Sequence, residues 1–478
     1  MGLITPEEYK QSLKDGRVIY YEGEKVDDVT THPALKVCVE TAAIDYEMAE
    51  TPEYRDLAVV THPKTGEPIS RYYYTPQNAE DLLKRHELMV TATRLGGGVI
   101  PFIHDIGADT LNAVNITANM MGKDEYRQRA EDYRYYLQKN DLSAASAVTD
   151  VKGDRMLRPS SPKQAHPDYY VRVVDKDDKG ITVRGAKAHI TASAYCKELF
   201  VIPCRNMTEE DKDYAVAFAI PVNTKGVKQI CHPITWRLGS LDFPNDRPIR
   251  NHTDSLIIFD DVFVPWERVF LCGEWQYAMA LVYNFAYLHR HTAASYRIPV
   301  SEVMVGAAQA MAEYNGIDKV PHVREKITNL VIYVDTLKSL ARASCMDYIT
   351  HAGMPIPNTV ISNIAKYHFA DNLHDCIKAI EDIAGGLLIT VPTYKDYQNP
   401  ETRDYIEKYL GGKAGIPTEH RLRMMQLIRR RLATFETEVL ALHAEGSLQA
   451  QRMTIYGESM PEIQKYKQWA EEAAGIKK

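Results

Sequence analysis

Two histidines stand close enough together in the sequence to suggest acid–base chemistry. His289 and His291 flank Arg290 and follow an apolar stretch at 283–288. Histidine changes charge near neutral pH, so either side chain could act as a general base. Residues two apart point to different sides of a helix, which argues against a joint metal site. The structural alternative is that one histidine is buried with a partner and the other is exposed.

A second cluster could recognise phosphate. Five arginines gather near the C-terminus: Arg421, Arg423, Arg429, Arg430 and Arg431. Such a face is commonly solvated or lies at a subunit contact, but it would also suit the phosphates of a nucleotide cofactor or a coenzyme A thioester. The glycine-rich stretch at 94–98 lacks the lysine and hydroxyl of a phosphate loop, and the stretch at 411–414 has Ala414 where a Ser or Thr would bind magnesium. We expect both to be loops that end helices.

The composition excludes several classes of protein. The 478 residues include 57 Lys+Arg and 64 Asp+Glu, a net charge of −7, which argues against nucleic-acid binding. No apolar run approaches the roughly 20 residues that span a bilayer, and the first residues lack a secretory pattern. The seven cysteines are scattered without a CxxC pair, so neither disulfides nor a zinc ribbon are expected. We therefore expect a reduced, cytoplasmic protein without a membrane span.

The elements that must position these residues fall into three regions. Residues 1–150 read as mostly helical, and 151–275 as short strands, including a hairpin over 168–190 and runs at 199–204, 214–222 and 255–266. Residues 276–478 return to long amphipathic helices, at 300–316, 322–353 and 418–446. The pattern predicts an α+β protein with an N-terminal helical domain, a middle β-barrel or sandwich and a C-terminal helical bundle.

Several short motifs together resemble one family over nearly the whole chain. They include Lys152-Gly153-Asp154-Arg155, Val183-Arg184-Gly185-Ala186, the run FDDVFVPWERVF at 259–270 and EDIAGG at 381–386. In this order they resemble the flavoprotein family that joins 4-hydroxyphenylacetate 3-hydroxylases to 4-hydroxybutyryl-CoA dehydratases. The resemblance implies an acyl-CoA-dehydrogenase-like fold, FAD held between the β-domain and the bundle, and a homotetramer or homodimer.

The resemblance also implies which residues contact the flavin. Asp154 and Arg155 match the family's flavin-side loop, and Thr191 matches a hydroxyl near the flavin. The stretch HAEGSLQAQR matches a C-terminal flavin-contacting segment through Gly446, Ser447 and Gln449.

Departures from the family concern its reaction centres. Three cysteines that hold the dehydratase's iron–sulfur cluster correspond to Pro101, Asp105 and Tyr296, and only the histidine ligand remains, as His289. Such clusters depend on thiolates, so we expect no iron–sulfur cluster and no other metal. A dehydratase glutamate becomes Asp254, as in the hydroxylases, and a tyrosine becomes Ala293.

The hydroxylase pocket is altered as well. Its arginine, tyrosine and histidine correspond here to Ile106, Thr110 and Ser146, which cannot recognise the same charged phenol. We take His289, His291 and Asp254 as catalytic candidates. Candidates for substrate binding are Thr110, Ser146, Tyr296 and Arg297.

Two functions fit these expectations. The first is a monooxygenase that receives FADH₂ from a separate flavin reductase and hydroxylates a phenol, with His289 or His291 as general base; the chain has no recognisable nicotinamide-binding motif. The second is a cluster-free double-bond isomerase or dehydratase-like lyase acting on a CoA thioester. There His289 would remove a proton beside the thioester carbonyl. A third possibility is a non-catalytic paralogue.

Overall fold

The chain folds into two structural units, each assembled from separate stretches of sequence. The computed structural model describes residues 2–234, 243–244 and 250–476. Unit 1 contains residues 2–234, 250–292 and 350–355 of these, and unit 2 contains 243–244, 293–349 and 356–476. The three-part division at residues 150 and 275 remains a prediction.

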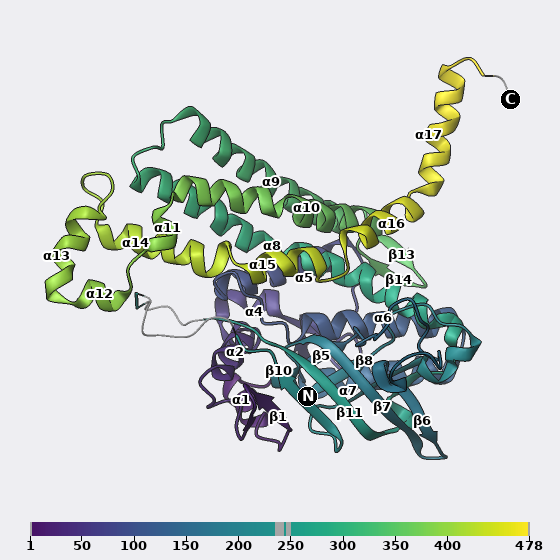
Figure 1. Cartoon of the computed structure of the whole chain (residues 1–478). Helices are drawn as coiled ribbons and strands as arrows, with labels where there is room; N and C mark the ends of the chain where they lie inside the picture. The colour runs from purple at the N-terminus through teal and green to yellow at the C-terminus, as the bar shows by residue number, and fades with distance from the viewer. Residues whose placement is uncertain (1, 235–242, 245–249, 477–478) are drawn as a thin grey trace. The chain divides into compact units, whose positions relative to one another are not determined.

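A six-stranded sheet forms one layer of unit 1, with strand order β2-β1-β10-β11-β7-β6 (Figure 1). Strand β1 runs parallel to β10, and the other pairs are antiparallel. Buried and exposed positions alternate along β10, as expected for a strand with one covered face. The predicted hairpin at 168–190 is confirmed by the pairing of β6 with β7. The strands are β1 (Ile19–Tyr21), β2 (Glu24–Val26), β6 (Arg172–Lys176), β7 (Gly180–Thr191), β10 (Val227–Cys231) and β11 (Asp254–Pro265).

A second sheet of unit 1 has four strands in the order β12-β9-β8-β5. Every residue of β5 and β8 is buried, so neither face of these strands meets solvent. Phe218 of β9 meets Phe259 of β11 edge to face at 5.9 Å, which joins the cores of the two sheets. The strands are β5 (Ala144–Ala147), β8 (Glu198–Val201), β9 (Val216–Pro221) and β12 (Val269–Cys272).

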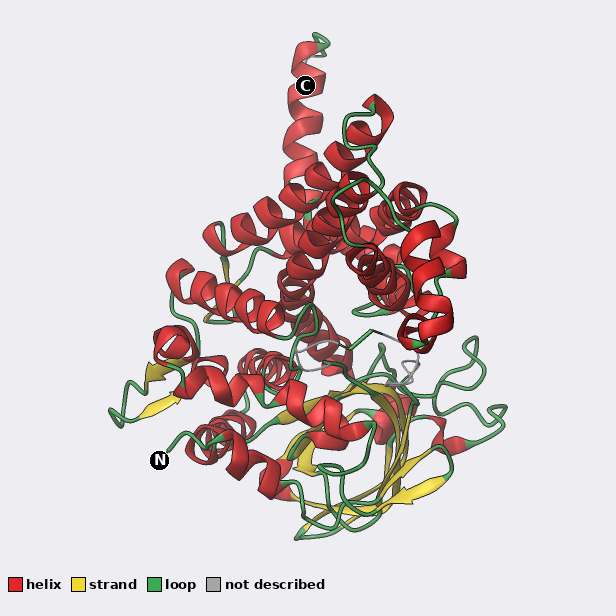
Figure 2. Ribbon diagram, turned by 90° about the vertical axis from the view of Figure 1, so that its left-hand side faces the viewer, coloured by secondary structure: helices red, strands yellow, loops and turns green. Residues whose placement is uncertain are grey.

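Helices lie beside these sheets in unit 1 (Figure 2). Helix α6 is buried at every position from Asp105 to Ala118, which makes it the central helix of the unit. The helices are α1 (Pro6–Ser12), α2 (Leu35–Ala42), α3 (Ile44–Glu50), α4 (Pro52–Ala58), α5 (Ala79–Leu95), α6 (Asp105–Met121) and α7 (Asp124–Asn140). Strands β3 (Val59–Thr61) and β4 (Pro68–Ser70) form a small hairpin. Short 3₁₀ turns are η1 (Arg71–Tyr73), η2 (Pro167–Tyr169), η3 (Ser193–Tyr195), η4 (Glu209–Tyr214), η5 (Trp266–Arg268) and η6 (Trp275–Tyr277).

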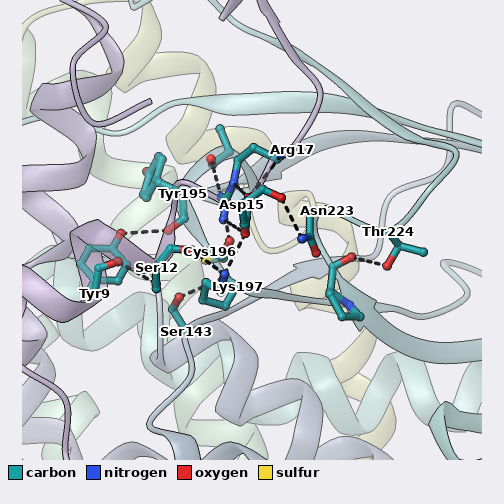
Figure 3. A network of polar contacts seen from close by, with 12 residues as sticks. Tyr9, Ser12, Asp15, Arg17, Ser143, Tyr195, Cys196, Lys197, Asn223 and Thr224 are labelled. Atoms are coloured by element: carbon teal, nitrogen blue, oxygen red, sulfur yellow. Dashed lines mark hydrogen bonds and ion pairs between the residues drawn. The ribbon is translucent and has the colours of Figure 1, made fainter. Parts of the chain in front are cut away.

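Polar contacts attach the N-terminal segment to the sheets of unit 1 (Figure 3). The Arg17 guanidinium donates to the carbonyls of Ala194 and Cys196, each at 2.9 Å, and also pairs with Asp15. Lys197 reaches the same Asp15 carboxylate at 2.7 Å. Arg17 is 7% exposed, so its charge is compensated by these acceptors rather than by water.

Unit 2 is a helical bundle in which α9 and α10 run side by side (Figure 1). The long helix α8 (Ala278–Tyr314) contributes residues to both units. The other helices are α9 (Pro321–Met346), α10 (Thr359–Ala384), α11 (Leu387–Thr390), α12 (Tyr394–Gln398), α13 (Pro400–Tyr409), α14 (Thr418–Leu427), the π-helical turn η7 (Ile428–Leu432), α15 (Phe435–His443), α16 (Leu448–Glu458) and α17 (Met460–Ala473). Strands β13 (Ile349–His351) and β14 (Met354–Ile356) form a short hairpin between α9 and α10.

Two helix predictions were wrong in detail. Residues 322–353 were expected to be helical, but α9 ends at Met346 and Ile349–His351 form β13, followed by a turn with positive φ at Ala352 and Gly353. Residues 418–446 were expected to form a single helix, but α14 leads into η7 and α15 begins separately. The physical cause is Thr434, which has an extended backbone and whose hydroxyl accepts from the Thr437 amide as an N-cap. Both glycine-rich stretches do follow helix ends, after Leu95 and Tyr409, as predicted.

Two further expectations concern membrane-spanning helices and the cysteines. None of the described helices is long and apolar enough to cross a membrane. All seven cysteines, each within the described ranges, are free thiols.

Replacing Arg17 with Met should destabilise unit 1, because two buried carbonyls would lose their donor and Asp15 one of its cations. We expect a loss of about 3 kcal/mol in the free energy of unfolding, measured by urea denaturation followed by circular dichroism. The control is Arg127→Met, since the Arg127 side chain is 45% exposed and pairs with Asp124 on the surface. That change should cost less than about 1 kcal/mol. Equal losses in the two variants would contradict the buried role of Arg17.

Candidate active site

The buried helix α6 places two acidic side chains on one face in unit 1. Asp105 and Asp109 are separated by one helical turn, so their carboxyl groups project from the same side. Gly107 lies between them, against β5. A Cβ added there would come within 2.6 Å of the Ala144 Cβ, so the close approach of helix to sheet requires glycine. The two acids are therefore held by a fixed backbone.

Asp109 is the centre of a buried charge network. Its Oδ1 accepts from the Arg85 guanidinium of α5 at 2.7 Å, and its Oδ2 lies 3.0 Å from His289 Nδ1. Asp109 is fully buried, which alone would raise the pKa of the carboxyl. The charge of Arg85 and the contacts with His289 outweigh burial and lower that pKa. Asp109 is thus an ionised carboxylate inside the protein.

His289 is oriented by this carboxylate and by an aromatic neighbour. Its ring stacks on Phe285 of the same helix, with centroids 4.8 Å apart. An ionised Asp109 favours a proton on Nδ1, so Nε2 becomes the basic nitrogen of the neutral ring. A histidine supported in this way can take up a proton and have its charge stabilised by the carboxylate.

The second histidine, His291, lies beside another histidine ring. His291 is 1% exposed and its ring lies 5.6 Å from the ring of His86, on α5. The expectation that one of the two histidines would be exposed was wrong, because both His289 and His291 are buried. The structure therefore places His289 against Asp109 and His291 beside His86.

The residues at the positions of the hydroxylase pocket are buried and hydrogen-bonded to one another. The hydroxyls of Thr110 and Ser146 are hydrogen-bonded to each other, and both reach the Ile106 carbonyl, at 3.2 and 3.1 Å. The structure brings these three residues together as the alignment suggested. Their polar atoms satisfy each other and form part of the packing between α6 and β5.

Asp105 has a different environment from Asp109. It is 1% exposed, and neither carboxyl oxygen has a hydrogen-bond partner among the described residues. Burial, reinforced by the negative charges of Asp45 and Asp109 and only partly offset by His289 and Arg85, raises the pKa of Asp105 from 3.8 to about 7. Two carboxyls one turn apart thus have opposite protonation tendencies.

The histidine before Asp105 belongs to the same interior. His104 Nδ1 lies 2.9 Å from Asp45, and its Nε2 lies 3.9 Å from Asp141. Burial opposes the charged form, but the contact with Asp45 and the charges of Asp141 and Asp105 raise the pKa of His104. A second titratable group therefore stands beside the acidic face.

The predicted flavin residues of unit 1 are Thr191, at the end of β7, and Asp154 and Arg155, on the loop that follows β5. Thr191 and Asp254 are cross-strand neighbours, and Asp254 Oδ1 is buried without a partner in the described chain. The loop carrying Asp154 and Arg155 is exposed, and the preceding Asp150 is held against β7 by its ion pair with Lys187 at 2.8 Å. The structure thus positions Asp254 beside a predicted flavin contact.

Two predicted substrate residues meet on a glutamate of unit 2. Tyr296 donates its hydroxyl to Glu445, and the Arg297 guanidinium pairs with the same carboxylate at 3.0 Å. Lys366 is fully buried and lies 3.8 Å from Glu445. The Glu445 side chain is 5% exposed, so a second buried, charge-compensated carboxylate stands directly before the predicted flavin stretch.

The predicted flavin residues of unit 2 form the start of α16. The Ser447 hydroxyl accepts from the Ala450 amide as an N-cap, and Gly446 has φ +94°, a conformation that favours glycine. Ser447 and Gln449 are exposed. Both lie at a helix N-terminus, where anionic groups are stabilised.

The arginine cluster is largely engaged within unit 2. Arg421 donates to Asn315 at 2.9 Å and to the Leu410 carbonyl at 2.8 Å. Arg423 pairs with Glu419 of its own helix and donates to the Pro244 carbonyl. These two arginines hold the fold together, and we assign them no phosphate-binding role.

The donor set around His289 does not fit an iron–sulfur cluster. Asp105 offers only oxygen and His289 only nitrogen, whereas such clusters are held by thiolates. Within the described ranges, no group of three His, Cys, Asp or Glu side chains has the arrangement of a metal site.

Sequence reasoning missed most of the charged partners. Arg85, Asp109, Lys366 and Glu445 were not singled out, and Asp105 was noted only as a lost cysteine. The Asp105–Asp109 spacing was a readable signal, because acids four residues apart in an apolar helix share a face. No local signal marked Arg85, Lys366 or Glu445, whose partners are distant in sequence.

Replacing Asp105 with Asn should change how stability depends on pH. With a folded pKa of about 7 and an ordinary value of 3.8, the folded protein holds a proton that the unfolded chain releases in between. Stability contributed here is therefore lost as pH rises through this interval, by up to about 4 kcal/mol. Asparagine cannot ionise, so the melting temperature of the variant relative to wild type should rise from pH 5 to pH 8. A pH-independent difference would contradict a buried neutral Asp105.

Comparison with known proteins identifies the family. The 4-hydroxyphenylacetate 3-hydroxylase N-terminal model matches residues 5–271 and the corresponding C-terminal model matches 278–475. The 4-hydroxybutyryl-CoA dehydratase/vinylacetyl-CoA-Delta-isomerase of Clostridium aminobutyricum is 33% identical, covering 99% of this chain and 100% of that protein. The oxygenase component of 4-hydroxyphenylacetate 3-monooxygenase from Thermus thermophilus is 31% identical, covering 88% and 87%.

Solved structures of the same two groups of proteins also match this chain. The oxygen-tolerant archaeal 4-hydroxybutyryl-CoA dehydratase of N. maritimus matches with a TM-score of 0.89 and 29% identity, over 100% of this chain and 96% of that one. The oxygenase component of 4-hydroxyphenylacetate 3-monooxygenase, complexed with FAD, matches with a TM-score of 0.87 and 26% identity, over 99% of both chains. Butyryl-CoA dehydrogenase of Megasphaera elsdenii, at a TM-score of 0.50 and 14% identity over 96% of this chain and 99% of that one, shows the shared fold alone. The predicted acyl-CoA-dehydrogenase-like α+β fold is confirmed, and the chain is an enzyme of the flavoprotein family that unites the 4-hydroxyphenylacetate 3-hydroxylases with the 4-hydroxybutyryl-CoA dehydratases.

Proposed function

We propose that this chain is a double-bond isomerase acting on a β,γ-unsaturated CoA thioester. The observation that carries the proposal is the buried pair of His289 and the ionised Asp109, whose charge Arg85 compensates. This pair provides a base in a site shielded from water, as removal of a weakly acidic C–H proton requires. Isomerisation of this kind moves a proton and needs no net oxidation.

The relatives support this choice over dehydration. One relative carries both activities in its name, dehydratase and vinylacetyl-CoA isomerase. This chain lacks the thiolates of an iron–sulfur cluster at Pro101, Asp105 and Tyr296 but keeps the histidine position. A chain with the base and without cluster ligands is suited to the proton-transfer reaction alone.

The pocket positions of the hydroxylases support it as well. A phenolate needs donors such as the family's arginine and histidine, which are absent here. The hydroxyls of Thr110 and Ser146 are already paired with each other and with the Ile106 carbonyl. Binding a phenol there would break these buried contacts at a cost of about 1–3 kcal/mol for each unsatisfied group.

The residues present fit FAD as the cofactor. Asp254 carries a buried oxygen without a partner among the described residues, beside Thr191. Asp154 and Arg155 offer exposed polar groups on the loop that follows β5. In unit 2, Gly446, Ser447 and Gln449 present the start of α16. FAD bound beside Thr191 and Asp254 would supply an electron-poor ring that stabilises negative charge developing on a substrate.

Within this function the chain's own residues have defined roles. His289 takes the proton from the carbon beside the thioester carbonyl, and Asp109 stabilises the resulting imidazolium. Arg85 keeps Asp109 ionised and positioned. We propose no catalytic role for His291, whose ring packs beside His86.

The second candidate is a monooxygenase that uses FADH₂ delivered by a separate flavin reductase. It is favoured by relatives such as the FADH(2)-dependent monooxygenase of Burkholderia cepacia, 26% identical over 89% of this chain and 83% of that protein. In that case His289 would deprotonate an aromatic hydroxyl. A homodimer or homotetramer in the cytoplasm is proposed with either function.

The proposal predicts that His289→Ala loses isomerisation. With FAD bound and without a reductant, wild type should convert a β,γ-enoyl-CoA to the conjugated isomer, followed by ultraviolet absorbance. Removing the base should lower the rate by about 10²- to 10⁴-fold. The matched control is His374→Ala, an exposed histidine of α10, which should retain the wild-type rate.

Two outcomes would contradict the proposal. One is a wild-type protein that leaves every β,γ-enoyl-CoA unchanged but hydroxylates phenols when given FADH₂ and oxygen. The other is a His289→Ala variant that isomerises as fast as the control.

A further inference from the structure

The buried carboxyl of Asp105 is not accounted for by the isomerase base. Its two oxygens have no hydrogen-bond partner in the described parts of the chain, although the side chain is 1% exposed. A buried polar group without partners costs free energy, and proteins retain such groups mainly where they are used. Asp105 therefore calls for a functional explanation.

Arg85 does not neutralise this carboxyl. Its guanidinium donates to Asp109 at 2.7 Å and to the backbone carbonyl of Asp105 at 3.3 Å. The Asp105 side chain is therefore a neutral acid near Arg85, whose charge is already paired with Asp109. The ion pair with Asp109 thus separates the roles of two acids on one helix face.

We propose that Asp105 is the second proton-carrying group of this site and donates the proton that completes isomerisation. This role rests on the proposed function and deepens it. His289 would break the C–H bond at the α carbon and hold its proton. Asp105 would give its own proton to the γ carbon, where the new C–H bond forms while the double bond moves into conjugation.

Protons and electrons balance in this sequence. One C–H bond breaks and one forms, and no oxidant or reductant takes part. The cycle closes when the proton on His289 passes to the Asp105 carboxylate, which restores a neutral imidazole and a neutral acid. His289 contacts Asp109, which lies one helical turn from Asp105 on α6, so the base and the acid flank the same carboxylate.

The surrounding charges suit the assignment. Burial first, then the negative charges of Asp45 and Asp109, favour the protonated form of Asp105 and raise its pKa, while His289 and Arg85 oppose this. Ionised Asp109 therefore supports the base and also keeps the acid protonated.

Other titratable groups face the same interior. Tyr72 of η1 is fully buried and within electrostatic reach of Asp105. His104 precedes Asp105, paired with Asp45 of α3 and near Asp141. The Asp45 partner favours a charged His104, which opposes protonation of Asp105 and would shift the fall in rate to lower pH.

The test uses Asp105→Asn in the full FAD-loaded protein, because asparagine has the shape of the protonated acid but no proton to give. In D₂O the variant should still exchange the α hydrogen of the thioester, seen by mass spectrometry, because His289 is intact. Isomerisation should fall by about 10²-fold or more. Wild-type isomerisation should decline as pH rises through about 7. The control Asp124→Asn, at an exposed position, should behave like wild type.

Infrared spectroscopy supplies a readout independent of turnover. The wild-type protein at pH 6 should show a carboxylic-acid carbonyl band that disappears at pH 9 and is missing in Asp105→Asn. Rapid isomerisation by Asp105→Asn, or a band unchanged by the substitution, would overturn the role of Asp105. A wild type with the band but neither exchange nor isomerisation would overturn the proposed function, and with it proton delivery to substrate, while leaving the neutral acid established.

Discussion

The buried carboxylate of Asp109 is the interaction on which the candidate site depends. Burying the ionised carboxyl of Asp109 costs free energy, and the Arg85 guanidinium at 2.7 Å compensates for this cost. Once ionised, Asp109 fixes the tautomer of His289 and makes its other nitrogen basic. The same negative charge disfavours ionisation of Asp105 one turn away. Burial is the first cause that keeps Asp105 protonated, and the Asp109 carboxylate, which also supports the base, adds to it after Asp45.

The fold explains why this arrangement is rigid. Helix α6 is buried along most of its length and approaches β5 so closely that only glycine fits at position 107. Phe285 fixes the His289 ring from the same helix. In unit 2, Glu445 is held in a comparable way by Tyr296, Arg297 and Lys366. Each unit therefore contains a preorganised carboxylate, as expected where charge must be controlled without rearrangement.

Much of the fold could be predicted from sequence, because alternating and helical hydrophobic patterns report local burial. The hairpin of β6 and β7 and the strands β8, β9 and β11 were read in this way. The break before α15 was missed because a single threonine cap overrides a continuous apolar pattern. The histidine at 289 was found, but its partners Arg85 and Asp109 lie about 200 and 180 residues earlier, and no local pattern reports such contacts. Asp105 was visible only as a replaced residue, since its importance comes from burial beside other acids.

On the proposed function, this family member moves protons without oxidation. The most direct measurement is anaerobic turnover of a β,γ-enoyl-CoA by the protein loaded with oxidised FAD, with the flavin absorbance followed throughout. We expect complete conversion to the conjugated isomer with the flavin still oxidised at the end. A requirement for oxygen and FADH₂, with no anaerobic isomerisation, would contradict this account.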